Sequence, residues 1–282
     1  MRVVGGYRLT GELGRGGMGV VYSALAPSGH PCALKVLLDL SDEEGFERFE
    51  REAEGASRLK HPNLIRVVDF GLANGHPYLV MPLLEGTNLR ERLRSGPLPI
   101  AEAIRIGATL ADGLAHAHAR GVLHRDLKPE NVVMGPSGPV LVDFGLAKPL
   151  LDRQSLTQTG QIVGTPAYMA PEQASGAKAG VGVGSDVYGL GALLYALLTG
   201  EAPFSGPTAL AILSAVLAES PPPPSSLRPE VSRSLDALVL RCLAKDPEDR
   251  FPEMTALGQA LREEGAPGAD SPPPARSSRR AA

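Results

Sequence analysis

Residues 124 to 131 read His-Arg-Asp-Leu-Lys-Pro-Glu-Asn, a stretch that brings an acid, a base and an amide into one short segment. Its acid, Asp126, is followed 17 positions later by a second aspartate, Asp143, in the triplet Asp-Phe-Gly behind an apolar run. An acid with an amide five residues on, and another acid at a strand end, suits the binding of a nucleotide's metal ions and the orientation of a hydroxyl group. The two stretches therefore predict a nucleotide and metal site.

The composition of the 282 residues fits a globular chain, with 43% hydrophobic and 21% charged residues. The net charge of −3 and a pI near 6.1 argue against nucleic acid as an obligatory partner. With two cysteines, Cys32 and Cys242, a disulfide framework is implausible, so we interpret both as packing residues in a reducing compartment.

No stretch predicts a membrane anchor. The start of the chain has no apolar signal core, and the most apolar long segment, residues 187–199, is shorter than the roughly 20 residues needed to span a bilayer. We therefore expect a cytoplasmic protein, or the cytosolic domain of a longer membrane-anchored parent.

The first part of the chain predicts a small, sheet-rich lobe with one helix. A capping box at residues 41–44 opens a charged helix that runs to about Lys60. Short β-prone runs, several bounded by glycine-rich turns, predict strands at 7–9, 20–23, 32–36, 64–68 and 78–81.

After Pro82 the pattern is helical. Apolar residues repeat at helical spacing from Ile104 to His118, and Gly121 ends that helix. More helices are expected at about 186–199, 207–218, 232–244 and 253–263, with 221–224 as a stiff proline connector and 152–160 as a mobile segment. The residues from Gly265 on are too poor in apolar side chains to order themselves. The domain therefore ends near Glu264, with a disordered tail at 265–282.

A glycine-rich loop precedes the second strand and consists of Gly14, Gly16, Gly17 and Gly19, followed by Val21. Glycines lack a Cβ, so the backbone can approach phosphates and offer its N–H groups. Dinucleotide-binding folds use a similar string, but theirs opens a helix, whereas residues 20–22 continue as a strand. The loop thus favours a lid over ATP, with an ordinary glycine-rich hairpin as the alternative.

Lys35 stands at the end of a strand, where it can reach the α- and β-phosphates if an acid holds it. Glu52 in the charged helix is the expected partner, since its apolar neighbours place it on the inward face. Glu50 and Glu54 are the competing acids, and a solvated charged helix is the alternative interpretation.

The loop itself supplies the chemistry. Asp126 is the candidate base that accepts or orients the proton of the substrate hydroxyl, and Lys128 can neutralise charge on the transferring phosphoryl group. Asn131 and Asp143 carry the oxygen ligands that Mg²⁺ prefers, with Mn²⁺ as an alternative metal. His124 has no serine or cysteine to activate, so we interpret it as a packing and hydrogen-bonding residue.

Over about residues 7 to 264 the chain resembles the eukaryotic-like protein kinases, and among them the bacterial serine/threonine type. The matching elements follow the family's order: 14–21, Lys35, Glu52, 124–131, 143–145, Ala170-Pro171-Glu172, 185–191 and Asp249-Arg250-Phe251. The resemblance implies an α+β, two-lobed fold, with a small antiparallel sheet and one helix at 7–82 and a larger, mainly helical lobe at 83–264.

The resemblance also implies roles for single residues. Thr165 would line the substrate pocket and contact Asp126, and Lys128 with the Gly-Thr-Pro segment is typical of serine/threonine specificity. Asp186 would hold the backbone of the loop at 124–131, and Arg250 would pair with Glu172. The adenine and its surroundings would be lined by Leu13, Val21, Ala33, Met81 as gatekeeper, Leu84 in the hinge, and Val133.

Thr157 and Thr159 resemble the sites at which bacterial members of the family phosphorylate themselves. A phosphate there would add roughly −2 charge, and Arg125, beside Asp126, is its expected partner. The alternative is two ordinary threonines in a polar loop. Phosphorylation of one copy by another would need a kinase dimer.

Two departures from the family pattern stand out. Residues 177–184 form a glycine-rich stretch about two residues longer than usual, so we expect a mobile loop and a looser anchor at Asp186. Pro82 in the hinge lacks an N–H group, which moves the adenine contact towards Leu84.

The sequence thus predicts an ATP- and Mg²⁺-dependent kinase that phosphorylates serine and threonine in proteins. Two alternatives remain open: a pseudokinase that acts as a binding scaffold, and a kinase of small molecules with the same fold.

Overall fold

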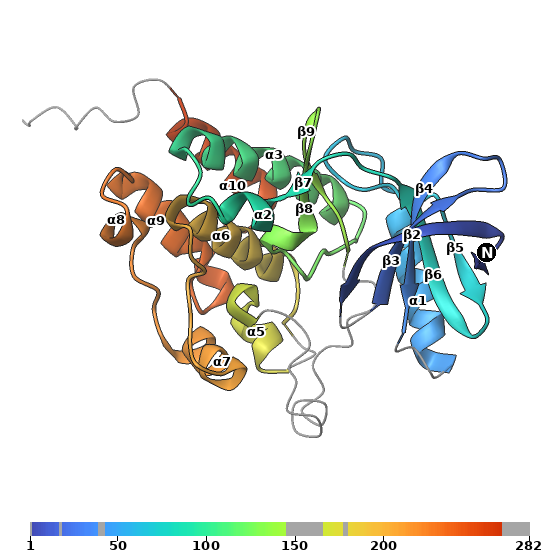
Figure 1. Ribbon diagram of the computed structural model, residues 1–282. Coiled ribbons are helices and arrows are strands. Elements are labelled where there is room, and N and C mark those ends of the chain that lie inside the picture. The colour runs from blue at the N-terminus through green and yellow to red at the C-terminus, as the bar shows by residue number, and fades with distance from the viewer. Residues whose placement is uncertain (1, 17–18, 39–42, 145–165, 177–179, 267–282) are drawn as a thin grey trace, which may run out of the picture.

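The computed structural model describes residues 2–16, 19–38, 43–144, 166–176 and 180–266, which form two lobes (Figure 1). The first is built on a sheet with strand order β1-β2-β3-β4-β6-β5, in which all neighbouring pairs are antiparallel. Its strands are β1 (Val3–Val4), β2 (Tyr7–Gly16), β3 (Gly19–Leu25), β4 (Pro31–Leu37), β5 (Asp69–Ala73) and β6 (His76–Pro82).

The two faces of this sheet bury different side chains. On the outer face a small cluster contains Leu34 and Val80, which lie directly opposite each other on β4 and β6. The inner face contributes Leu37, Leu79 and Met81 to the main core, which also contains the helices of the second lobe. Alternation along the strands therefore turns one face of the sheet towards the helical lobe.

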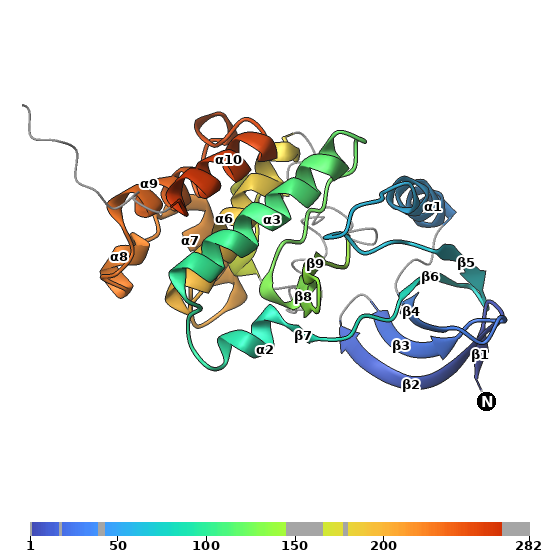
Figure 2. The same cartoon turned by 90° about the horizontal axis from the view of Figure 1, so that it is seen from above.

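Helix α1 (Glu43–Ser57) packs on the inner face of the sheet (Figure 2). Its Phe49 and Ala53 are fully buried in the main core, and Phe49 makes an edge contact with Phe70 of β5. The helix was expected at 41–60, and residues 41–42 of its predicted capping box lie outside the described residues.

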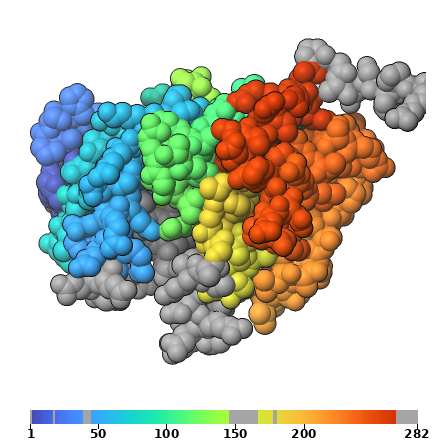
Figure 3. Space-filling model, turned by 180° about the vertical axis from the view of Figure 1, so that it is seen from behind, coloured from blue at the N-terminus to red at the C-terminus, as the bar shows by residue number. Residues whose placement is uncertain are grey.

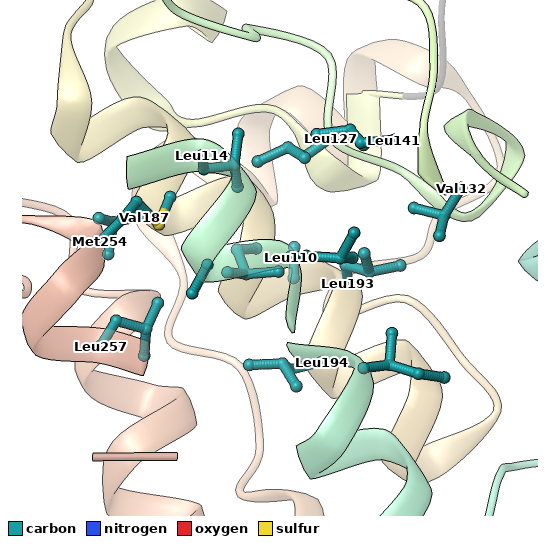
Figure 4. Packing of buried hydrophobic residues seen from close by; sticks show 14 of the residues in the cluster. Leu110, Leu114, Leu127, Val132, Leu141, Val187, Leu193, Leu194, Met254 and Leu257 are labelled. Carbon is teal, nitrogen blue, oxygen red and sulfur yellow. The ribbon is translucent and has the colours of Figure 1, made fainter. Parts of the chain in front are cut away.

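The second lobe surrounds α6 (Val183–Thr199), in which every residue from Ser185 to Leu198 is buried. Leu193 and Leu194 of α6 pack with Leu110 and Leu114 of α3 (Ile100–His118) (Figure 4). The remaining helices are α2 (Leu89–Leu93), α5 (Pro171–Ala174), α7 (Ala209–Ala218), α8 (Pro224–Leu227), α9 (Arg233–Cys242) and α10 (Met254–Glu264). A helix without a polar side is typical of the centre of a domain.

A small second sheet, β7-β8-β9, lies in the helical lobe near the sheet-rich lobe (Figures 1 and 2). Its strands are β7 (Thr87–Asn88), β8 (Val132–Gly135) and β9 (Gly138–Leu141). Strand β8 directly follows the loop at 124–131 in the chain. Seen from behind, the early residues and the late residues occupy opposite sides of the molecule (Figure 3). The sheet thus holds the loop at 124–131 and Asp143 close to where the lobes meet.

One expected strand, 64–68, is wrong. The strand lies at Asp69–Ala73 instead, while Leu64 bridges Leu141 and the N–H of Ile65 donates to the carbonyl of Leu141 at 2.9 Å. Within the apolar run that predicted a strand, Leu64, Ile65 and Val67 are buried in the main core, whereas Val68 is exposed. The expected strand at 7–9 is confirmed but extends to Gly16, and the other expected strands and the long helices are confirmed within a few residues.

Three short helices, α2, α5 and α8, were not expected, and α8 begins at Pro224 inside the predicted proline connector. Across the described ranges, no helix combines the length and apolar character needed to cross a membrane.

Candidate active site

The glycine-rich segment lies at the adjoining ends of two paired strands, β2 and β3, and residues 20–22 continue as a strand, as the sequence predicted. Gly14 lies opposite Val21, and Gly16 lies opposite Gly19, across β2 and β3. A Cβ at Gly19 would lie 2.2 Å from the carbonyl oxygen of Val36, whereas a Cβ at Gly14 would meet nothing within 4 Å. Gly19 is therefore required by the close approach of β4, and Gly17 lies outside the described residues.

Four residues predicted to contact the nucleotide share one face of the sheet. Val21 lies opposite Lys35, and Ala33 lies opposite Met81. Directly opposed residues and residues two apart on a strand point to the same side. Because Met81 belongs to the core shared with the helical lobe, this common face is turned towards that lobe.

The other residues expected around the adenine lie on separate elements. Val133 is on β8, opposite Val140 of β9. Leu84, after Pro82 at the end of β6, packs against the main core, and Leu13 on β2 is 54% exposed. These residues come from both lobes, as a site between the lobes requires.

Lys35 is held by Asp143. Its Nζ lies 2.5 Å from Asp143 Oδ1, although the two residues are 108 positions apart in the chain. Asp143 has a φ of 62°, in the left-handed region that non-glycine residues seldom adopt. Lys35, the residue predicted to reach the phosphates, therefore lies in direct contact with Asp143, the candidate metal ligand.

The expected ion pair between Lys35 and Glu52 is not formed in this structure. Glu52 Oε1 instead accepts a hydrogen bond of 2.7 Å from Nη1 of Arg125. Burial raises the pKa of the Glu52 carboxyl, and the guanidinium of Arg125 partly offsets that effect. Helical periodicity placed Glu52 on the inward face correctly, but it could not distinguish between the two cations that lie on that side.

Asp126 is surrounded by donors from its own loop. Lys128 Nζ lies 2.9 Å from Asp126 Oδ2, and Asn131 Nδ2 donates to the carbonyl of Asp126 at 2.8 Å and to Oδ2 at 3.1 Å. These bonds orient the carboxylate and use the nitrogen of the Asn131 amide. The amide oxygen is then the atom with which Asn131 could bind a metal.

His124 is fully buried, and its environment defines its protonation. Its Nε2 lies 3.0 Å from the carbonyl of Val142, an acceptor, and its Nδ1 receives the backbone N–H of Asp126 at 3.2 Å. The ring is therefore neutral with its proton on Nε2, and burial lowers its pKa further. This geometry fits the prediction that His124 packs and orients the loop.

Asp186 connects the central helix to the loop. Its carboxylate accepts the backbone N–H groups of His124 at 2.8 Å and Arg125 at 2.7 Å, and lies 2.7 Å from Nε2 of His118. The side chain is 1% exposed. The expected loosening of this anchor is wrong, because α6 begins at Val183 and its packing fixes Asp186 irrespective of the glycine-rich stretch before it. Residues 177–179 of that stretch lie outside the described residues.

Arg250 and Glu172 form a buried, two-pronged ion pair. Nη1 and Nη2 of Arg250 lie 2.8 and 2.9 Å from the two carboxylate oxygens of Glu172, which also accepts the hydroxyl of Ser185 at 2.7 Å. Burial alone would raise the pKa of Glu172, but the hydrogen bonds from Arg250 and Ser185 outweigh it, so the pKa is lowered. This contact is the one that the family resemblance implies.

Two residues of the site carry no recognisable sequence signal. His118 is the last residue of α3 and bonds to Asp186. Gln173 follows Glu172 and donates to the carbonyl of Arg125 at 2.9 Å. Each is a polar residue among ordinary helix residues, so only its place in space shows its role. The predicted residues Thr157, Thr159 and Thr165 lie outside the described residues, as does the tail from 267.

The donor set fits Mg²⁺ held together with nucleotide phosphates. Asn131 and Asp143 offer an amide and a carboxylate oxygen, and no group of three or more His, Cys, Asp or Glu residues in the described part of the chain could hold a metal ion. Mg²⁺ commonly binds through one or two protein oxygens plus substrate phosphates, whereas a zinc site needs more protein ligands.

Comparisons with a family model and with known proteins all indicate the same family. The model of the protein kinase domain matches residues 7–261. The serine/threonine-protein kinase PknB of Mycobacterium leprae is 41% identical over 254 residues, which cover 87% of this chain and 40% of that protein. The serine/threonine-protein kinase PkaA of Streptomyces coelicolor is 43% identical over an alignment 282 residues long, which covers 93% of this chain and 50% of that protein.

The kinase domain of Mycobacterium tuberculosis PknI, known from a crystal structure, superposes with a TM-score of 0.76 at 32% sequence identity. The match covers 93% of this chain and 97% of that one. This chain therefore covers nearly all of that crystallised kinase domain but half or less of the length of the curated relatives named above. The fold, the site geometry and these likenesses show that the chain belongs to the protein kinase family and, within it, to the bacterial serine/threonine-protein kinases.

Proposed function

We propose that residues 7–264 are a catalytic domain, with lobes at 7–82 and 83–264, that transfers the γ-phosphoryl group of ATP to serine and threonine hydroxyls of proteins. The observation that carries this proposal is the position of Asp126. Lys128 and Asn131 hold its carboxylate, and Asp186 holds the backbone on its N-terminal side. A preorganised acid of this kind is suited to orient a hydroxyl for in-line transfer.

Asp126 accepts or orients the proton of the attacking hydroxyl, and Lys128 moves from the carboxylate to the charge that develops on the phosphoryl group. Thr165 contributes to the pocket for the hydroxyl-bearing residue. Bound ATP supplies the phosphoryl group, and its Mg²⁺ neutralises the negative charge. Peptide recognition by the segment before α5 (Pro171–Ala174) favours protein substrates over small molecules.

The nucleotide lies between the lobes, against the common face of the sheet. Ala33, Val21 and Val133 enclose the adenine, with Leu13, Met81 and Leu84 at its edges. The phosphates are covered by the glycine loop, which contains Gly14, Gly16, Gly17 and Gly19. The close packing of Gly19 against β4 supports the position of this loop at the end of the sheet. Lys35 would contact the phosphates of ATP, and a metal ion held by Asp143 would compete with Lys35 for the carboxylate with which it pairs here.

Metal binding falls to Asp143 and the amide oxygen of Asn131, with Mg²⁺ as the expected ion. The exchange of partners at Asp143 has a consequence for Glu52. If Lys35 left Asp143, Glu52 of α1 would be the acid expected to pair with it, provided that Arg125 released Glu52.

Regulation by phosphorylation acts through the same arginine. A phosphate on Thr157 or Thr159 would compete with Glu52 for Arg125, because a dianion is the stronger partner of a guanidinium. Phosphorylation of one copy by a second copy would supply that phosphate. We expect no nucleic-acid partner, and we place the domain on the cytoplasmic side, whether alone or as part of a longer protein.

Transfer of labelled phosphate tests the proposal. The purified chain, given ATP labelled at the γ-position, Mg²⁺ and a generic basic protein, should label serine and threonine of that protein, and chelation of Mg²⁺ should abolish the signal. Binding of ATP without any transfer would instead indicate a scaffold. Transfer to small alcohols but never to protein would indicate a small-molecule kinase.

A further inference from the structure

Gln173 is the third residue of α5 and uses both ends of its side-chain amide on backbone groups. Its Oε1 accepts the N–H of Ala170 at 3.1 Å, and its Nε2 donates to the carbonyl of Arg125 at 2.9 Å. Because one partner can only donate and the other can only accept, the orientation of the amide is fixed by its surroundings. The side chain thus connects the start of α5 with the loop that carries Asp126.

The carbonyl that Gln173 binds belongs to the peptide group joining Arg125 to Asp126. Arg125 has a φ of 63°, a left-handed conformation that is strained for a residue with a side chain. Its N–H donates to Asp186 Oδ1 at 2.7 Å on the other side. Asp186 and Gln173 therefore hold the two polar backbone groups of the strained residue immediately before the candidate base.

These contacts close into a ring. Ser185 and Asp186 are neighbours on α6, and Glu172 and Gln173 are neighbours on α5. Ser185 donates to Glu172 at 2.7 Å, Asp186 accepts from Arg125, and Gln173 donates to Arg125. The buried pair of Glu172 with Arg250 fixes α5 within the lobe. Gln173 is the one member that joins α5 to the loop directly.

We propose that Gln173 is a positioning residue for phosphoryl transfer, which acts through the carbonyl of Arg125 to set the direction of Asp126. Its bond to Ala170 couples this setting to the segment at 166–170, which leads into α5, so the peptide-binding side and the base move as one unit. The inference rests on the proposed kinase activity. Gln173 touches neither reactant and is not itself a catalytic residue.

Two substitutions separate this role from a general loss of structure. Gln173→Met keeps the volume and removes both hydrogen bonds. Gln173→Glu keeps the shape and can still accept from Ala170, but its ionised carboxylate cannot donate to Arg125. Gln259→Met is the matched control, because Gln259 is exposed on α10 and bonds only to a neighbouring surface residue among the described contacts, Glu263.

We expect kcat for a peptide substrate to fall about tenfold in Gln173→Met, while KM for ATP stays within about twofold, since Lys35 and Asp143 are untouched. The deficit of Gln173→Glu relative to the wild type should shrink as pH is lowered from 7.5 to 5.5, because the facing carbonyl of Arg125 raises the pKa of the introduced carboxyl, and its protonated form regains a donor. Gln173→Met should show no such recovery, and Gln259→Met should match the wild type.

Wild-type kcat in Gln173→Met would overturn the inference, as would a fall of kcat that is matched by equal losses of ATP affinity and thermal stability. A deficit of Gln173→Glu that is the same at every pH would also contradict it. These results leave the kinase activity standing. Absence of transfer by the wild-type chain would contradict the proposed function, and this inference with it.

Discussion

Arg125 Nη1 lies 2.7 Å from Glu52 Oε1, so the residue beside the candidate base holds the acid of α1. The same arrangement leaves Lys35 with Asp143. The observed pairs are thus Arg125 with Glu52 and Lys35 with Asp143, whereas nucleotide binding is expected to pair Lys35 with Glu52. Exchange of these partners would bring Glu52 to Lys35 and free Asp143 for metal.

The energy of the Arg125–Glu52 pair can be measured by a double-mutant cycle with Arg125→Gln and Glu52→Gln. Both side chains are partly exposed, 34% and 24%, which reduces the expected coupling to about 1 kcal/mol. Urea unfolding of the unphosphorylated chain gives the value. Protein phosphorylated at Thr157 and Thr159 should show a smaller coupling, because Arg125 then has a second anion.

The matched control for this cycle is the Arg58–Glu54 pair, in which both side chains are well exposed and the coupling should be at most about 0.5 kcal/mol. Equal coupling energies in the two cycles would show that the Arg125–Glu52 pair is no stronger than an exposed surface pair.

The buried pair of Arg250 and Glu172 should matter more for folding. Glu172→Ala leaves a guanidinium with 0% side-chain exposure without its carboxylate, which should lower the free energy of unfolding by about 3 to 5 kcal/mol. Asp112→Ala breaks the exposed pair with Arg262 and should cost less than about 1 kcal/mol. Chemical denaturation of both variants makes the comparison, and similar costs would contradict the account of the buried pair.

The glycine loop offers a test with two similar substitutions. Gly19→Ala places a Cβ 2.2 Å from the Val36 carbonyl oxygen, so β3 and β4 must separate, at a cost of about 1 to 3 kcal/mol. Gly14→Ala meets nothing within 4 Å and should leave unfolding nearly unchanged. Thermal unfolding distinguishes them, and ATP titration should show weaker binding for Gly19→Ala. Equal stability of the two variants would mean that the close approach at Gly19 is not real.

Glu172 and Glu52 should affect the pH dependence of stability in opposite directions. The pKa of Glu172 is lowered from 4.5 by folding, so its contribution is present above pH 4.5 and is lost as pH falls through the lower folded value. The pKa of Glu52 is raised from 4.5, so ionising it costs stability as pH rises through the folded value.

The comparison is made by measuring unfolding free energies of Glu172→Gln and Glu52→Gln from pH 3 to 7. The loss caused by Glu172→Gln should grow as pH rises to about 4.5. The stability of the wild type relative to Glu52→Gln should decrease as pH rises above 4.5. Parallel curves for the two variants would show that the local environments described for the two acids are wrong.

The sequence predicted the elements better than the contacts between them. Glycine spacing and the run at 32–36 predicted β2 to β4, because strand alternation and turn residues are local properties. The run at 64–68 misled the prediction because its burial comes from Leu141, which is distant in the chain. The short helix α5, of four residues, shows no repeat from which periodicity could find it.

In the site, too, the residues in local motifs could be predicted, whereas the contacts between distant residues could not. Asp126, Asn131 and Asp143 could be named from spacing, since their chemistry requires those residue types in that order. The partner of Glu52 could not, because periodicity indicates only which side of α1 faces inward, whereas the observed pairs are Glu52 with Arg125 and Lys35 with Asp143. Gln173 could not be named either, since its role depends on a loop 48 residues away.

The most direct test of the central claim is phosphotransfer by Asp126→Asn, with ATP affinity measured on the same protein. Asparagine keeps the shape but cannot accept the proton, so transfer to a protein substrate should fall by about a thousandfold or more while ATP affinity stays within about twofold. Asp112→Asn, at an exposed site on α3, should behave as the wild type. Unchanged turnover by Asp126→Asn would contradict the assignment of Asp126 as the base.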